Sequence, residues 1–140
     1  MATMHCLVDI PTRELFSGEI YYASVPGSDG RYGVLPGHEM LVATNSAGVL
    51  TLWMDEAGKD RREFLLYEGA AHVYNNVLTV LGRFGVETKN IDIDEVRAKA
   101  ENMRQTIEEL EGSDDDADKA KLDTSRSRLA WYELQIATVG

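Results

Sequence analysis

Cysteine is nearly absent from this chain of 140 residues, which contains Cys6 and no other cysteine. One thiol cannot form a disulfide within the chain or supply the ligands of a four-cysteine zinc site. The sequence therefore excludes a small secreted fold held by disulfides, and it excludes a zinc finger. Because Cys6 lies in an alternating apolar pattern, we expect a buried, unreactive thiol and a fold stabilised by apolar burial.

Positive charge and long apolar runs are also scarce. The 14 Lys and Arg residues stand against 24 Asp and Glu, so the formal net charge is −10. Such a chain repels phosphate backbones, and nucleic acid is not an expected partner. The apolar runs are far shorter than the roughly 20 residues that span a bilayer, and no signal-peptide pattern opens the chain. We expect a soluble, intracellular protein that meets a membrane only indirectly.

Glycine, proline and aromatic residues become rare after Asn90. Residues 1–90 hold 10 of the 12 glycines, all 3 prolines and 9 of the 11 aromatic residues. The more acidic part of the chain is the remainder, with 13 acidic and 7 basic residues in its 50 positions. This shift in composition predicts two domains, residues 1–90 and residues 91–140.

Residues 1–90 show the period of two that is typical of β-strands, with turn-forming residues at intervals of roughly 8 to 12. About eight to ten short strands without an intervening helix predict a small β-sandwich. Asn75-Asn76 is predicted to be a two-residue hairpin turn, and Ser17-Gly18 and Glu68-Gly69 are also predicted to be turns. The strands expected from the pattern are Met4–Ile10, Ile20–Val25, Val49–Met54, Glu63–Tyr67, Ala71–Tyr74 and Val77–Leu81.

After Asn90 the apolar period becomes helical, and two helices of about 20 residues are predicted to form an antiparallel hairpin. Asp92 is placed to cap the first helix, with Glu95 three residues later, and Gly112 is placed to end it. The apolar face of the first helix comprises Val96, Ala100, Met103, Ile107 and Leu110. The expected seam of the second helix comprises Ala117, Ala120, Thr124, Ser127, Trp131 and Leu134.

The side chains that could perform catalysis are few and scattered. His5, His38 and His72 have no spacing that would place two metal ligands on one face, and no nucleophile or phosphate-loop motif is present. The acidic run Asp114–Asp118 begins like a calcium loop but lacks the glycine and the bidentate Glu that such a loop needs. We therefore expect a protein that is not an enzyme and needs no cofactor or metal.

A turn-rich segment, Gly30–His38 (GRYGVLPGH), is the most distinctive part of the sequence. It resembles the GxLGILPGH loop of the epsilon subunit of F-type ATP synthases. Pro11–Glu19 is similar to the P-x-R-E-x-F-S-G-E segment of that family, and Tyr67–Leu81 is similar to its YVSGG…VTVL strands. These landmarks keep the order and spacing of the family along essentially the whole chain, including the change to two helices near residue 91.

The resemblance implies a rotor subunit of the central stalk in a proton-translocating bacterial enzyme, peripheral on the cytoplasmic face of the plasma membrane. Its β-sandwich would bind the gamma subunit and stand on the ring of c-subunits, with Arg31, Tyr32, Leu35 and His38 at this interface. Arg31 replaces an acidic residue that is usual in the family, which predicts a compensating acidic residue on the ring. The helical hairpin would regulate the complex by extending into the alpha/beta catalytic head and restraining ATP hydrolysis.

The resemblance also implies a regulatory ATP site. Some bacterial members bind ATP through an I/L-D-x-x-R-A sequence, which is similar to Ile93–Ala98 here. Thr124 stands where the family has a further arginine, so one phosphate contact is missing. The nucleotide-binding residues carried over are Asp94, Arg97, Ala98, Arg104 and Arg128.

Two other interpretations stay open from the sequence. One is a factor that associates with RNA polymerase and holds Mg²⁺ through Asp114 and its neighbours at the hairpin tip. The other is a free-standing nucleotide sensor without a gamma subunit. An exposed Asp94–Arg97 pair with no ligand is the ordinary alternative to the ATP site.

Overall fold

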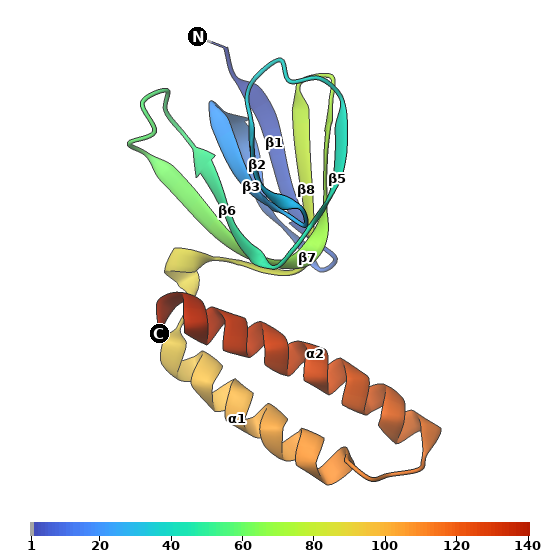
Figure 1. The fold of residues 1–140 in the computed structure, drawn as a ribbon. Coiled ribbons are helices and arrows are strands. Elements are labelled where there is room, and N and C mark those ends of the chain that lie inside the picture. The colour runs from blue at the N-terminus through green and yellow to red at the C-terminus, as the bar shows by residue number, and fades with distance from the viewer. Residues whose placement is uncertain (1) are drawn as a thin grey trace. The chain divides into compact units, whose positions relative to one another are not determined.

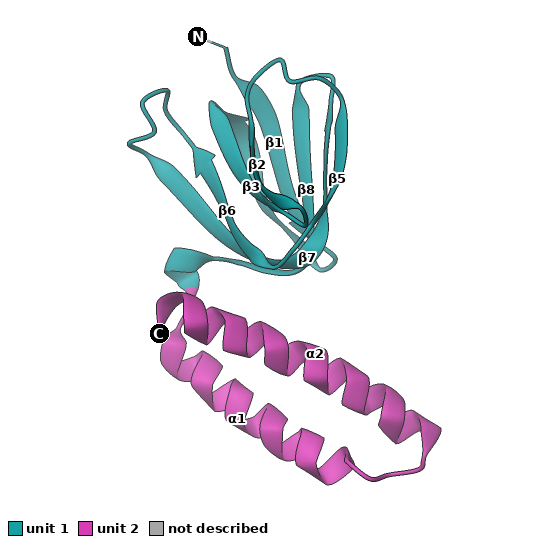
Figure 2. Ribbon diagram, viewed as in Figure 1, with its two compact units in different colours: residues 1–90 teal, residues 91–140 magenta. Residues whose placement is uncertain are grey.

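The computed structural model describes residues 2–140. The chain consists of two compact units, Met1–Asn90 and Ile91–Gly140 (Figure 2). The first unit contains eight strands followed by a short 3-10 helix, and the second contains two α-helices (Figure 1). The strands are β1 (Met4–Ile10), β2 (Arg13–Ile20), β3 (Tyr22–Gly27), β4 (Gly30–Val34), β5 (Leu41–Asn45), β6 (Gly48–Trp53), β7 (Arg61–Tyr74) and β8 (Val77–Glu87). The helices are the 3-10 turn Thr88–Asn90, α1 (Ile93–Leu110) and α2 (Asp116–Val139).

The eight strands form a β-sandwich, as the alternation predicts. Along the sheet the order is β2-β1-β8-β7-β5-β3-β4, and β6 pairs with both β3 and β7. All pairings are antiparallel except that of β1 with β8. The first half of β7 pairs with β6 and its second half pairs with β5, so this strand crosses from one layer of the sandwich to the other.

A kink in β7 makes this crossing possible. Glu68 and Gly69 have positive φ angles of 52° and 151°, yet the pairing with β8 continues on both sides without a change of register. A Cβ on Gly69 would collide with the carbonyl oxygen of Leu81, so only glycine fits here. The predicted turn at Glu68-Gly69 is therefore a bend inside one strand of 14 residues.

The core lies between the two layers and is formed by apolar side chains, although Asn45 and Glu87 of the same unit are also buried. Met4, Cys6 and Val8 of β1 are fully buried, which confirms the alternation seen in the sequence. Burial raises the pKa of the Cys6 thiol to about 12, because an apolar surrounding disfavours the thiolate. The residues of this sandwich core all come from the first unit, and the largest fully buried side chains are Phe64, Met4, Ile20, Leu50, Leu52, Leu65 and Leu78.

Three strands, β2, β4 and β5, were not predicted. Gly18 lies inside β2 and pairs with Cys6, whereas the sequence pattern predicts a turn there. The ring of Phe16 covers this glycine, since a Cβ on Gly18 would lie 3.2 Å from the ring. Glycine thus marks close packing here rather than a change of chain direction.

Helix α1 forms as predicted. The Asp92 side chain accepts a hydrogen bond from the backbone N–H of Glu95 at 3.3 Å, and Gly112 has a φ of 85° just after the helix. The predicted apolar face is confirmed, because Val96, Ala100 and Ile107 are buried and the other two positions are half-buried.

The predicted seam of α2 is wrong in its first half. Ala117, Ala120 and Thr124 are exposed, whereas Leu122 is half-buried and Ser125 is buried. Burying one leucine side chain removes more apolar surface from water than burying two alanine methyl groups, so the helix turns Leu122 inward. Trp131, also in the predicted seam, is buried.

We predict that Gly69→Ala destabilises the sandwich by about 3–5 kcal/mol, because it combines backbone strain with a collision against β8. Gly30→Ala is the matched control: Gly30 also has a positive φ, of 124°, but a Cβ there meets nothing within 4 Å. That variant should lose only about 1–2 kcal/mol from strain. Urea unfolding measures both changes, and equal losses would contradict the proposed role of the kink.

Candidate interaction site

The loop that follows β4 has a fixed conformation. Pro36 and Gly37 form a turn in which Gly37 adopts a φ of 79°. The backbone N–H of His38 donates to the carbonyl of Leu35 at 3.1 Å and closes the turn. Leu35 is 59% exposed and His38 is also exposed, so two of the four residues predicted for the docking interface lie at the surface of this loop.

Asn76 anchors the loop to the rest of the sandwich. Its side-chain carbonyl accepts a hydrogen bond from the N–H of Gly37 at 2.9 Å, and its amide donates to the carbonyl of Thr3 at 2.9 Å. Asn75 and Asn76 have φ angles of 52° and 61°, which confirms the predicted two-residue hairpin turn. The turn between β7 and β8 therefore holds the loop in place.

The other two predicted interface residues, Arg31 and Tyr32, also make contacts within the sandwich. The Arg31 guanidinium donates to the carbonyl of Ser24 at 3.1 Å, to its hydroxyl at 2.9 Å and to the carbonyl of Val49 at 2.6 Å. It thereby ties β4 to β3 and β6. Arg31 is nevertheless exposed, and its three acceptors are uncharged, so the compensating acidic residue expected on a partner stays a prediction.

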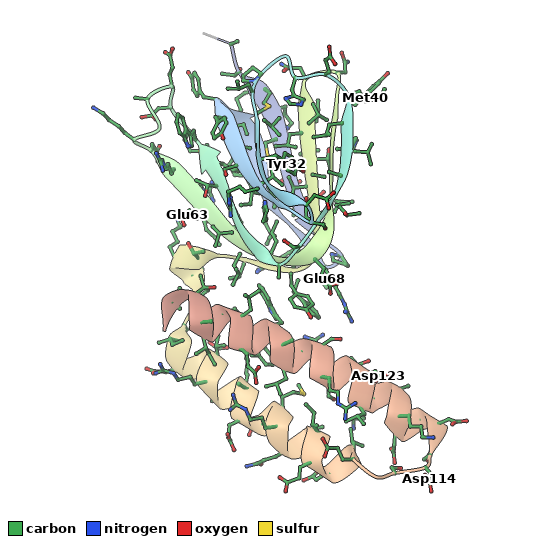
Figure 3. The ribbon with its side chains drawn as sticks, in the orientation of Figure 1. Tyr32, Met40, Glu63, Glu68, Asp114 and Asp123 are labelled. Carbon is green, nitrogen blue, oxygen red and sulfur yellow. The ribbon has the colours of Figure 1, made fainter. Side chains whose placement is uncertain are left out.

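Tyr32 lies among the strands of the sandwich (Figure 3). It is half-buried and packs against the core, and its hydroxyl donates to the side-chain carbonyl of Asn45 at 3.3 Å. Partial burial raises the pKa of the Tyr32 phenol. Tyr32 therefore contributes to the sandwich itself.

A broad apolar surface covers the outer side of β5, β7 and β8, and we call it the outer face. The cross-strand pairs place Val42 beside His72 and Leu81 beside Ala70. Because side chains alternate along a strand, Tyr74 lies on the same side as His72. Met40 projects outward where the chain enters β5 (Figure 3). Met40, Val42, Tyr74 and Leu81 are 73%, 78%, 63% and 47% exposed.

The sequence also marks this face, through two long segments without charged residues. Charged residues make up 27% of the chain, yet Met40–Met54 and Gly69–Gly82 contain no Asp, Glu, Lys or Arg. An exposed sheet surface without charges is unusual for strands that border water, and surfaces of this kind are typical of protein–protein interaction sites.

The predicted nucleotide-binding residues do not all lie together. Asp94, Arg97 and Ala98 are exposed in the first turns of α1. Arg104, further along, forms ion pairs with Glu101 at 3.3 Å and, across the hairpin, with Glu133 at 3.6 Å.

Arg128 lies far from this group within the hairpin. The ion pairs Arg104–Glu133 and Arg126–Glu111 fix the antiparallel register of the two helices. This register places Arg128 beside residue 109, which is about 22 Å from Asp94 at a rise of 1.5 Å per residue. In this hairpin, Arg128 therefore lies about four helical turns from Asp94.

Other polar residues that the sequence singles out, at the hairpin tip and in β1, form hydrogen bonds within their own unit. Asp115 caps α2 by accepting from the N–H of Ala117 at 2.9 Å, and Asp118 accepts from the Ser113 hydroxyl at 2.8 Å. His5 bonds Glu19 at 2.8 Å and Ser17 at 3.2 Å, which joins β1 to β2. Within residues 2–140, no group of three or more His, Cys, Asp or Glu side chains is arranged to hold a metal ion.

Comparison with known proteins defines the class of the first unit. The family model described as "ATP synthase, Delta/Epsilon chain, beta-sandwich domain" matches residues 3–87. The ATP synthase epsilon chain of Rhodopseudomonas palustris (strain BisB5) is 33% identical over 133 residues, which cover 95% of this chain and 91% of that protein. The epsilon chain of Bradyrhizobium sp. (strain BTAi1) is 32% identical over 123 residues, covering 88% and 89%. The chain belongs to the ATP synthase epsilon chain family.

Solved structures agree with the fold. A chain in the OSCP/F1/c-ring assembly of the Euglena gracilis mitochondrial ATP synthase matches with a TM-score of 0.67 and 21% identity, covering all of this chain and 83% of that one. A chain of the central stalk/c-ring assembly from Tetrahymena thermophila mitochondria matches with a TM-score of 0.54 and 16% identity, covering 98% and 96%. At these identities the similarity establishes the architecture alone.

We predict that Asn76→Gly releases the loop after β4. Glycine keeps the positive φ of the turn but removes both side-chain hydrogen bonds, which should cost about 1–2 kcal/mol of stability. Asn75→Gly is the matched control, because Asn75 has a similar φ and should change stability by less than about 0.5 kcal/mol. Amide hydrogen exchange at Gly37 should accelerate only in the first variant; unchanged exchange there would show that Asn76 does not hold the loop.

Proposed function

We propose that this chain is a non-catalytic subunit of the central stalk of a proton-translocating F-type ATP synthase, where it links the gamma subunit to the c-ring. The observation that carries the proposal is the outer face, an apolar and charge-free surface on an otherwise acidic protein. The chain belongs to the ATP synthase epsilon chain family, so we expect the partner of this face to be another subunit of that complex.

The outer face is the proposed binding surface for the gamma subunit. Val42, Tyr74 and Met40 each expose more than half of their surface, and burying a side chain of this kind yields about 1.5–3 kcal/mol. The sheet beneath them is fixed by regular pairing between β5, β7 and β8, so little conformational entropy is lost on binding. A rigid apolar surface of this kind suits a permanent partner.

The loop after β4 is the proposed contact with the c-ring. Leu35 and His38 are exposed on it, and the hydrogen bond from Gly37 to Asn76 holds it to the sandwich. A loop that transmits torque has to resist displacement, and this anchor provides that resistance. Contact with the ring makes the chain peripheral on the cytoplasmic face of the bacterial plasma membrane. Among residues 2–140, no helix combines the length and apolar character needed to cross a bilayer.

The helical hairpin is the proposed regulator of ATP hydrolysis, acting on the alpha/beta head when it extends. It forms a compact unit of its own, and its cross-helix ion pairs Arg104–Glu133 and Arg126–Glu111 are exposed. Exposed ion pairs contribute only about 0–1 kcal/mol each, so these two pairs add little to the stability of the closed hairpin beyond its buried apolar face. A separate unit of this kind suits an element that moves between two arrangements.

A regulatory ATP molecule would bind through Asp94, Arg97 and Ala98 in this proposal. These residues are exposed near the start of α1, where the helix dipole favours anions. Arg104 would have to leave Glu101 and Glu133 before it could contact a phosphate. The RNA-polymerase hypothesis, with Mg²⁺ held by Asp114 and its neighbours, has no comparable support, because the chain belongs to the ATP synthase epsilon chain family.

We predict that Val42→Asp weakens retention of the chain by immobilised gamma subunit about tenfold or more, because binding would bury an unpaired carboxylate. Val139→Asp is the matched control, since Val139 is also exposed, at 44%, but lies at the end of α2. Both variants should keep the circular dichroism of the parent chain. Full retention of the Val42 variant would refute docking through the outer face.

We also predict that a chain ending at Asn90 still folds, because every residue of the sandwich core lies before that point. In a reconstituted complex, this truncated chain should bind gamma and permit faster ATP hydrolysis than the full chain. Thermal unfolding tests the first expectation and steady-state ATPase activity tests the second. Equal ATPase activities of the two complexes would remove the regulatory role of the hairpin.

A further inference from the structure

A pocket lies in the sandwich, apart from the outer face. It has a volume of about 560 Å³ and is formed where β3 begins, where β6 ends and where the chain leaves β4. This volume is within the range of roughly 300–1,000 Å³ that is usual for binding pockets. Its lining residues are Ala2, Tyr21, Tyr22, Leu35, Pro36, Trp53 and Glu56.

The aromatic walls of this pocket are held in place. Tyr22 and Trp53 pair across β3 and β6, and their rings meet edge to face with centroids 4.8 Å apart. Gly33 leaves room for the Tyr22 ring and Gly58 for the Trp53 ring, because a Cβ at either position would collide with the ring. The pocket is therefore preorganised, and a ligand would not have to order these side chains.

Trp53 already interacts with one cation of its own chain. The Arg61 guanidinium lies 5.0 Å from the ring centroid, and its Nε donates to the carbonyl of Gly58 at 2.6 Å. Arg61 is not among the residues that line the pocket, so it does not occupy it. The rings of Tyr21, Tyr22 and Trp53 line the pocket, and such rings attract cations through their electron-rich faces.

Glu56 is the one charged residue in the lining, and it is exposed and forms no ion pair within residues 2–140. An aliphatic side chain in the pocket would cover this carboxylate without giving it a partner. An anion would be repelled by it. A planar guanidinium, in contrast, stacks on aromatic rings and pairs with a carboxylate through two N–H groups.

We propose that this pocket receives the guanidinium of an arginine that a partner polypeptide presents. Leu35 belongs both to the pocket and to the loop assigned above to the c-ring, so the choice of partner rests on the proposed function. The recognition chemistry itself rests only on the aromatic rings and Glu56. The pocket and the outer face are therefore separate binding sites with separate tests.

The test uses the full chain with ¹⁵N-labelled tryptophan and three short peptides. The probe is acetyl-Gly-Arg-Gly-amide, and citrulline or norleucine replaces the arginine in the two control peptides. The chain has two tryptophans, and Trp131 in α2 serves as the internal reference for Trp53. We expect a saturable shift of the Trp53 indole N–H signal with the arginine peptide, and an affinity at least about fivefold weaker with citrulline.

Two isosteric variants complete the test. Glu56→Gln should weaken binding of the arginine peptide about threefold or more, whereas Glu108→Gln, which removes an exposed carboxylate from α1, should leave it unchanged. Equal binding of arginine and citrulline peptides, tighter binding of norleucine, or equal shifts of both tryptophans would each overturn the proposal. Retention by the gamma subunit is tested with a variant of the outer face. A pocket that does not bind the arginine peptide would therefore leave the gamma result intact, and loss of gamma binding would leave the pocket result intact.

Discussion

The architecture of the first unit depends on the kink at Glu68 and Gly69. Without it, β7 would continue straight and could pair with either β5 or β6 along its length, but not with both in two layers. The positive φ of Gly69 and the close approach of Leu81 limit this position to glycine. One residue without a side chain thus allows a single long hairpin, β7–β8, to serve both layers of the sandwich.

The surfaces that matter for function follow from this hairpin. The half of the hairpin nearest its turn carries Tyr74 and Leu81 on the same face of the sheet as Val42 of β5, and this arrangement produces the outer face. Its turn presents Asn76, which holds the loop that contains Leu35. The proposed gamma and ring contacts are therefore built on the same pair of strands, which gives a rigid mechanical connection between two partners.

The sequence predicts features that depend on local chemistry. The Asn75-Asn76 turn, the Asp92 cap and the buried face of α1 each arise within a few residues, and all three are confirmed. Strands β2 and β4 were missed because the pattern takes their glycines as signs of turns, whereas Gly18 lies against the ring of Phe16 and Gly33 leaves room for the ring of Tyr22 on β3. Long-range partners likewise determine the role of Arg31, whose acceptors lie on β3 and β6.

Amide hydrogen exchange of the full chain, alone and bound to the gamma subunit, tests the central claim most directly. Backbone amides of β5 and of the second half of β7 should gain protection in the complex, because the outer face lies over these strands. The amides of β4 and β6 should change little. Protection confined to β4, β6 or the helical hairpin, with no change in β5 and β7, would contradict the account.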